Sequence, residues 1–84
     1  MDVEVIRAKI KETISRVTGI HVESIADTAA YETDLGLDSL SILEISVEVE
    51  NQFKFHASDE EMSSLKTVED AVNLVKKRLS AEVA

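Results

Sequence analysis

The spacing of apolar residues predicts an amphipathic helix near each end of the chain. In the first helix, apolar residues recur at intervals of three and four with charged residues between them, at Val3, Ile6, Ile10, Ile14 and Val17. Asp2 is placed to cap its start, and Gly19 suits the position just past its end. The helix near the C-terminus has the same spacing at Val68, Val72, Val75 and Leu79. Residues 67–70 open it with the spacing of a capping box, and residues 76–78 are expected to close it with positive charge.

The segment from Leu40 to Phe53 carries two conflicting patterns. Residues 44–50 alternate between polar and apolar side chains, which locally favours a strand. A strand needs a partner, and no other alternating segment is long enough to supply one, so we predict a helix. One apolar stripe of this helix consists of Ile42, Ile45, Val49 and Phe53. A second stripe, about 100° round the helix, consists of Leu40, Leu43 and Val47. The first stripe is expected to face the core, and the second either packs on another neighbour or binds a partner.

A short third helix and a long loop complete the predicted fold. Ser58 and Glu61 have the spacing of a capping box, and Met62 and Leu65 are the only apolar anchors of the helix that follows. Residues 19–38 form a connection much longer than the ~2–8 residues usual between helices of a bundle. We expect this loop to be tied down by Ile20, Val22, Ile25, Tyr31 and Leu35. The fold class is therefore all-α: a single domain over residues 1–84, a small four-helix bundle of three main helices and one short helix, with a long loop between the first two.

Composition excludes several classes of function. The 84 residues carry a formal charge of −8, which disfavours binding to nucleic acid and favours a basic partner. There is no cysteine, so a disulfide, a thiolate zinc site and a cysteine nucleophile are excluded. The two glycines cannot form a phosphate-binding loop. No stretch is long and apolar enough to insert into a membrane, and the N-terminus lacks the pattern of a signal peptide. We expect a cytoplasmic monomer.

The negative charge is concentrated in the middle of the chain. Between Arg16 and Lys54 there are eight acidic residues and no Lys or Arg, whereas the remaining nine acids and nine bases cancel. Such a region is either a solvated face or a source of an electric field that steers a basic partner. Three of these acids, Glu44, Glu48 and Glu50, neighbour the second apolar stripe. The stripe and its acidic rim are therefore a candidate docking surface.

Ser39, at the end of the long loop, is the candidate site of chemistry. Either Asp38 or Ser39 can be the N-cap of the helix that follows. A nucleophilic role is disfavoured, because His21 and His56 lie in no recognisable triad context and no Gly-x-Ser-x-Gly elbow is present. A calcium loop is excluded, since in a loop that has Asp34 as its first position the third and twelfth positions are Gly36 and Ile45, which supply no side-chain oxygen. A phosphate ester on Ser39, in contrast, would meet free N–H groups and the positive end of the helix dipole.

A family pattern is carried by residues 34–40 (Asp-Leu-Gly-Leu-Asp-Ser-Leu), Glu44, Phe53 and residues 66–72. In this pattern the chain resembles the acyl carrier proteins of fatty-acid and polyketide synthesis. The resemblance covers essentially the whole chain and implies a carrier without catalytic activity. It implies that a phosphopantetheinyl transferase attaches 4'-phosphopantetheine from coenzyme A to Ser39. The thiol of that arm then carries acyl groups as thioesters, which are presented to acyltransferases, ketosynthases and other acyl-processing enzymes with basic docking surfaces.

The resemblance also implies roles for individual residues. The positions expected to contact partner enzymes are Asp38, Leu40, Leu43, Glu44, Val47, Glu48 and Glu50. The positions expected to line a shelter for the acyl chain are Ile42, Ile45, Val49, Phe53, Met62 and Val72. No metal site is expected.

Departures from the commonest family pattern leave the pathway open. Ser41 stands where fatty-acid carriers usually have an acid, Glu48 where a small residue is common, and Ser58 where a proline is often found. A polyketide or other specialised pathway therefore fits as well as fatty-acid synthesis. Met1 favours a free-standing carrier over an excised domain. The alternative function is an acidic helical adaptor that binds a basic partner through its second helix and uses Ser39 only as a cap.

Overall fold

The computed structural model describes residues 2–83 of the chain, with side-chain surroundings for residues 2–79. The elements are α1 (Val3–Thr18), the 3-10 turn η1 (Val22–Ser24), α2 (Ser39–Phe53), α3 (Asp59–Ser63) and α4 (Val68–Val83). Over residues 2–83 the only β pairing is one isolated bridge between Ala30 and Thr67. The predicted all-α fold, with three main helices and one short helix, is confirmed. None of the helices described is long and apolar enough to cross a membrane.

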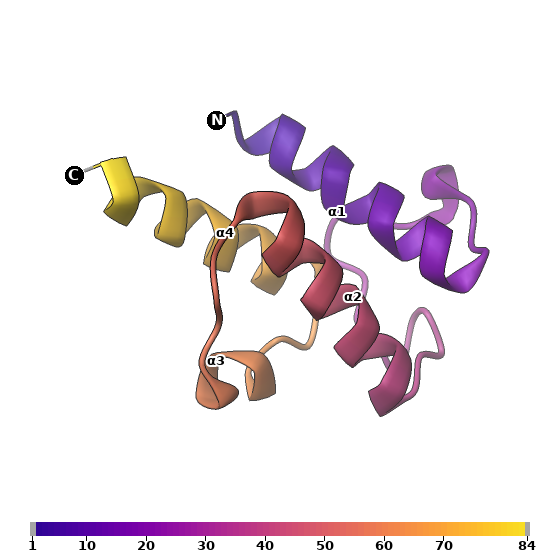
Figure 1. The fold of residues 1–84 in the computed structure, drawn as a ribbon. Coiled ribbons are helices and arrows are strands. Elements are labelled where there is room, and N and C mark those ends of the chain that lie inside the picture. The colour runs from indigo at the N-terminus through magenta and orange to yellow at the C-terminus, as the bar shows by residue number, and fades with distance from the viewer. Residues whose placement is uncertain (1, 84) are drawn as a thin grey trace.

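The three long helices form the bundle, and α3 lies beside it. α1 contacts both α2 and α4. In Figure 1, α1 begins and α4 ends at the left of the view, whereas α2 begins at the right, near the tip of the long loop. The buried core draws on all three helices and on the loop, and its largest fully buried members are Tyr31, Ile6, Ile10, Ile14, Ile25, Ile45, Val68, Val72 and Val75. The site at the start of α2 is thus at one end of an elongated molecule.

The predicted caps of three helices are present. The Asp2 carboxylate accepts the Glu4 N–H at 3.0 Å, and Gly19 ends α1 with φ 82°, a left-handed conformation that suits glycine. In α3, Ser58 Oγ accepts the Glu61 N–H at 3.1 Å and Glu61 accepts the Ser58 N–H at 2.9 Å. Thr67 and Asp70 make the same reciprocal pair at the start of α4, with both distances 3.1 Å. Local sequence therefore determines where these helices begin.

The end of α4 differs from the prediction. Residues 76–78 were expected to form its last turn, but the helix continues to Val83. The prediction was wrong because residues 79–84 contain neither Gly nor Pro, and Leu, Ala and Glu among them favour continued helix. Arg78 consequently lies within α4, where its side chain reaches the segment between α2 and α3.

α2 is helical throughout, including residues 44–50, whose alternating sequence pattern locally favours a strand. Its first stripe faces inward: Ile45, Val49 and Phe53 are buried, and Ile42 is half-buried against the core. The second stripe, Leu40, Leu43 and Val47, is exposed. Burial of one stripe against α1 and the core outweighs the local preference of alternating β-branched residues for a strand. The prediction of two apolar stripes is confirmed. The second stripe is exposed rather than buried against a neighbouring helix, which leaves it accessible to a partner.

The long loop is held by its own apolar residues and by the start of α4. Ile25 and Tyr31 are buried as predicted, and Ile20 and Leu35 pack partly buried against the core. Val22 was expected to help but is exposed. The Tyr31 N–H donates to the Lys66 carbonyl at 2.9 Å, and the Val68 N–H donates to the Ala29 carbonyl at 3.0 Å. Burial raises the pKa of the Tyr31 hydroxyl well above its ordinary value.

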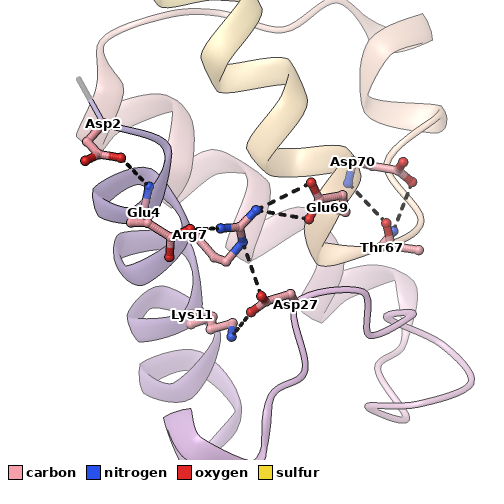
Figure 2. Close-up of polar contacts among 8 residues, drawn as sticks. All are labelled: Asp2, Glu4, Arg7, Lys11, Asp27, Thr67, Glu69 and Asp70. Carbon is pink, nitrogen blue, oxygen red and sulfur yellow. Dashed lines mark hydrogen bonds and ion pairs between the residues drawn. The ribbon is translucent and has the colours of Figure 1, made fainter.

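An ion-pair cluster fastens α1 to the loop and to α4 (Figure 2). The Arg7 side chain is only 14% exposed, and its guanidinium nitrogens lie 2.6 Å from the carboxylate of Glu4, 3.3 Å from that of Glu69 and 3.8 Å from that of Asp27. Lys11 pairs with the same Asp27 carboxylate, and its hydrogen bond lowers the pKa of Asp27. One cation thus connects three segments that are distant in sequence, which fixes the loop whose other end carries Ser39.

Candidate functional site

The candidate site begins with the capping geometry of α2. Asp38 precedes the helix in an extended conformation, and its carboxylate accepts the Ser41 N–H at 2.8 Å. This hydrogen bond lowers the pKa of Asp38, so the cap is ionised at neutral pH. Of the two predicted caps, the structure shows Asp38. Ser39 is therefore the first residue of the helix rather than its cap.

The surroundings of Ser39 fit a covalently attached phosphate group. Ser39 is exposed, and its hydroxyl takes part in no hydrogen bond with the other residues that the structure describes. Because Ser39 and Leu40 are the first two residues of α2, their N–H groups have no acceptor within the helix. These N–H groups and the helix dipole stabilise negative charge at this end. A phosphodiester on the Ser39 hydroxyl is both sterically accessible and electrostatically favoured.

An open cleft of about 340 Å³ adjoins Ser39, which we call the outer cleft. It lies between α2 and α3 and includes residues from two loops; its lining residues are Glu32, Ser39, Ile42, Leu43, Ser46, Met62, Ser63, Leu65 and Lys66. The walls near the helices are mostly apolar, and charged residues stand only at the loop rim. The Ser39 hydroxyl therefore has a partly apolar surface beside it that is large enough for an attached group.

Behind the outer cleft lies a much smaller space between α2, α3 and α4, which we call the inner cavity. Its volume is about 10 Å³, about the minimum for one water molecule. Ser46, Met62 and Leu65 line both spaces and therefore separate them. Deeper in, the inner cavity is lined by Tyr31, Ile45, Val49, Glu50, Phe55, Ala57, Ala71, Leu74 and Val75.

The residues predicted to line an acyl shelter are divided among these spaces. Ile45 and Val49 line the inner cavity, Ile42 lines the outer cleft, and Met62 lines both. Phe53 and Val72 are buried in the core and line neither space. Sequence periodicity located the inward face of α2 but missed the contributions of Ser46, Phe55 and Ala57. Phe55 and Ala57 lie outside any helix, where periodicity gives no signal.

The predicted partner surface is largely an exposed strip on α2. Leu40 is 63% exposed, Leu43 51% and Val47 43%, which is unusual for large apolar side chains in so small a domain. Glu44 is exposed beside them. A shallow groove is lined by Leu43, Glu44, Val47 and Glu48 together with Val17, which belongs to the apolar stripe of α1. The Glu48 carboxylate also forms an ion pair with Arg16 of α1, with Oε2 of Glu48 2.7 Å from Nη2 of Arg16.

Glu50 has a different environment from the other acids of α2. Its side chain is only 12% exposed, and its carboxylate accepts the Ala57 N–H at 2.7 Å. The same carboxylate lies 3.1 Å from Nδ1 of His56. Glu50 thus connects the end of α2 to the segment before α3 and lines the inner cavity rather than the exposed strip.

His56, one of the two histidines considered as a base for Ser39, lies far from it along the chain. His56 follows the C-terminal end of α2, whose 15 residues span roughly 22 Å from Ser39. That distance is too large for proton transfer between His56 and the Ser39 hydroxyl. Within the described part of the chain, no group of three or more His, Cys, Asp or Glu residues could hold a metal ion.

Comparison with known proteins gives one consistent result. Residues 8–75 match the family model described as the phosphopantetheine attachment site. The chain is 39% identical over 70 residues to an acyl carrier protein of Kocuria rhizophila, covering 83% of this chain and 86% of that one. It is 37% identical over 78 residues to an acyl carrier protein of Rickettsia bellii, with 93% and 91% covered. A solved structure of the acyl carrier protein from Enterococcus faecalis matches with a TM-score of 0.75 at 30% identity, covering 92% of this chain and 98% of that one.

Proposed function

The chain belongs to the acyl carrier protein family and carries acyl groups on phosphopantetheine in fatty-acid or polyketide synthesis, and we propose that Ser39 is the residue to which the group is attached. The support is the free, exposed hydroxyl at the N-terminal end of α2. Asp38 contributes by capping the helix, which leaves the Ser39 hydroxyl unengaged. When bound, the group supplies the thiol that the cysteine-free chain lacks.

The exposed strip on α2 is the proposed docking surface for acyl-processing enzymes. Leu40, Leu43 and Val47 supply apolar contact, and Glu44 and Glu48 supply negative charge beside it. We propose that the phosphopantetheinyl transferase and the acyl-processing enzymes present basic residues to this strip, with Asp38 beside the attachment point. Such pairings associate fast and weaken with salt, which suits a carrier that must leave each enzyme. Glu50 is not included, because its carboxylate is engaged with residues 56 and 57.

We further propose that the chain itself has no catalytic activity and acts in the cytoplasm. The separation between Ser39 and His56 supports the first statement. An activated-ester assay with and without the His56→Ala substitution checks it, and turnover that depends on both Ser39 and His56 would contradict it. Fractionation of cells that express a tagged chain checks the location.

Intact mass spectrometry tests the attachment site. The purified chain is incubated with coenzyme A and a broad-specificity phosphopantetheinyl transferase, and we expect the added mass of one phosphopantetheinyl group. Ser39→Ala should abolish the addition, whereas the matched control Ser41→Ala, two residues along the same helix, should retain it. Failure of the wild-type chain to gain mass, with the transferase active on another carrier, would leave the acidic adaptor as the better explanation.

A further inference from the structure

Two sets of polar contacts hold one wall of the inner cavity in place. We define this α3 wall as residues 55–65, which include four residues that line the cavity: Phe55, Ala57, Met62 and Leu65. Apart from these apolar contacts, its described attachments to the long helices are made by Glu50 of α2 and Arg78 of α4. The polar contacts that hold the wall to the long helices thus come from two residues, Glu50 and Arg78.

Arg78 makes three contacts with the α3 wall. Nη1 of the guanidinium donates to the His56 carbonyl at 3.0 Å, and Nη2 pairs with the Glu61 carboxylate. The same guanidinium lies 5.9 Å from the centroid of the Phe55 ring, within the range of a cation–π contact. Because Phe55 lines the inner cavity, Arg78 holds a cavity residue as well as the backbone and the short helix.

Glu61 connects Arg78 to the capping of α3. Its carboxylate accepts the Ser58 N–H and also pairs with Arg78. The hydrogen bond from the Ser58 N–H, together with the charge of Arg78, lowers the pKa of Glu61 and keeps the carboxylate ionised at neutral pH. The orientation of α3 is thus fixed to α4 by an ion pair that can be removed without removing the cap.

The closed wall leaves too little room for an acyl chain. An inner cavity of about 10 Å³ accepts at most one water molecule, whereas the outer cleft beside Ser39 is more than thirty times larger. The lining shared by the two spaces includes Met62 and Leu65 of the wall. A chain that passes from the outer cleft to the inner cavity must therefore displace the α3 wall.

We propose that Arg78 is a positioning residue that sets how readily a long acyl chain enters the inner cavity, by holding the α3 wall closed through Phe55, His56 and Glu61. This inference rests on the proposed function of Ser39 as the attachment site. A short acyl group stays in the outer cleft and leaves the contacts of Arg78 intact. A long one breaks them, so the strength of these contacts discriminates between acyl groups by length.

Thermal unfolding of two loaded forms tests the proposal. The wild-type chain and its variants are loaded from acetyl-coenzyme A or octanoyl-coenzyme A with the transferase, and loading is verified by intact mass. In Arg78→Gln we expect the Tm of the acetyl form to fall by about 4–8 °C, the size of a modest loss in a domain of this length. The Tm of the octanoyl form should change much less, because its contacts to Arg78 are already broken.

Two further variants separate this role from a structural one. Glu61→Gln removes the ion pair but keeps an oxygen that can accept from Ser58, so it should reproduce the acetyl-specific loss in weaker form. Lys77→Gln removes a neighbouring exposed charge of α4 that belongs to none of the ion pairs among residues 2–79, and should affect neither form.

Three outcomes have distinct meanings. A loss confined to the acetyl form of Arg78→Gln and Glu61→Gln supports the proposal. Equal losses in the acetyl and octanoyl forms would overturn it and leave Arg78 a purely structural residue, while the assignment of Ser39 stands. If the wild-type chain accepts no acyl group at Ser39, the proposed function fails, and the role of Arg78 in acyl entry fails with it.

Discussion

The contact of α1 with the loop and α4 differs from the exposed strip of α2 in how its charges are used. On the first side, Arg7 and Lys11 are matched by carboxylates of Glu4, Asp27 and Glu69. On the strip, Glu44 belongs to no ion pair among the described residues, although apolar side chains surround it. The first arrangement stabilises the monomer, whereas the second leaves charge and apolar area available to another molecule. The protein thus separates its stabilising surface from its proposed docking surface.

The largest expected effect contrasts a core residue with a strip residue. Ile10 is fully buried in α1, so Ile10→Ala should lower the free energy of unfolding by about 2–5 kcal/mol. Leu43→Ala, at a half-exposed position, should change it by less than about 0.5 kcal/mol. Urea denaturation measures both. The two substitutions should rank the other way in their effect on the KM of the phosphopantetheinyl transferase, which Leu43→Ala should raise more than Ile10→Ala does. A large loss of stability from Leu43→Ala would show that the strip is part of the core.

A smaller effect is expected from breaking the ion-pair cluster. Arg7→Gln leaves the carboxylates of Glu4, Asp27 and Glu69 without their shared cation, so we expect the Tm to fall by several degrees. The matched control is Arg16→Gln, which removes one exposed pair with Glu48 and should alter the Tm little. Circular dichroism melts compare the two. Equal shifts would mean that the partial burial of Arg7 adds nothing to its contribution.

Sequence patterns predicted the features of the fold that depend on local interactions. Caps at Asp2, Ser58 and Thr67 involve residues two or three positions apart, and all three are present. The inward face of α2 followed from helical periodicity once the absence of a strand partner was recognised. Ser39 could be proposed because a short motif and a helix start coincide.

Features that depend on contacts between distant segments were not predictable in the same way. Arg7 contacts Glu69, 62 positions away in the sequence, and Arg78 contacts Glu61, 17 positions away. At such separations the pattern of charges along the chain does not show which residues pair. Glu50 was grouped with Glu44 and Glu48 by proximity in sequence, yet its carboxylate turns toward Ala57. The size of the inner cavity depends on such contacts as well, and periodicity identifies the facing residues without giving the space between them.

The carboxylates engaged in contacts within the fold should make its stability depend on pH. The pKa values of Asp27, Asp38 and Glu61 are lowered in the folded chain by hydrogen bonds or ion pairs. Because these groups bind protons more weakly in the folded chain, they contribute to the free energy of unfolding, and this contribution is complete above their unfolded pKa, about 4. It is lost as the pH falls through their folded pKa values. We expect stability to drop below about pH 4, and Asp27→Asn to make this drop shallower in urea titrations. An unchanged profile in Asp27→Asn would contradict the contribution of its pair with Lys11.

The smallest expected effect distinguishes two acids of α2. Glu44 has no cationic partner among the described residues, so Glu44→Gln should relieve self-repulsion and raise stability by up to about 0.5 kcal/mol. Glu48→Gln relieves the same repulsion but loses the pair with Arg16, so its net effect on stability should be close to zero. Both substitutions should weaken binding to the transferase and flatten its dependence on salt, because each removes a charge from the proposed docking surface. Salt titration of the transferase KM measures this second effect independently of stability. If Glu44→Gln leaves the salt dependence unchanged, the negative charge of the strip does not steer the partner, and apolar contact through Leu40, Leu43 and Val47 must account for docking.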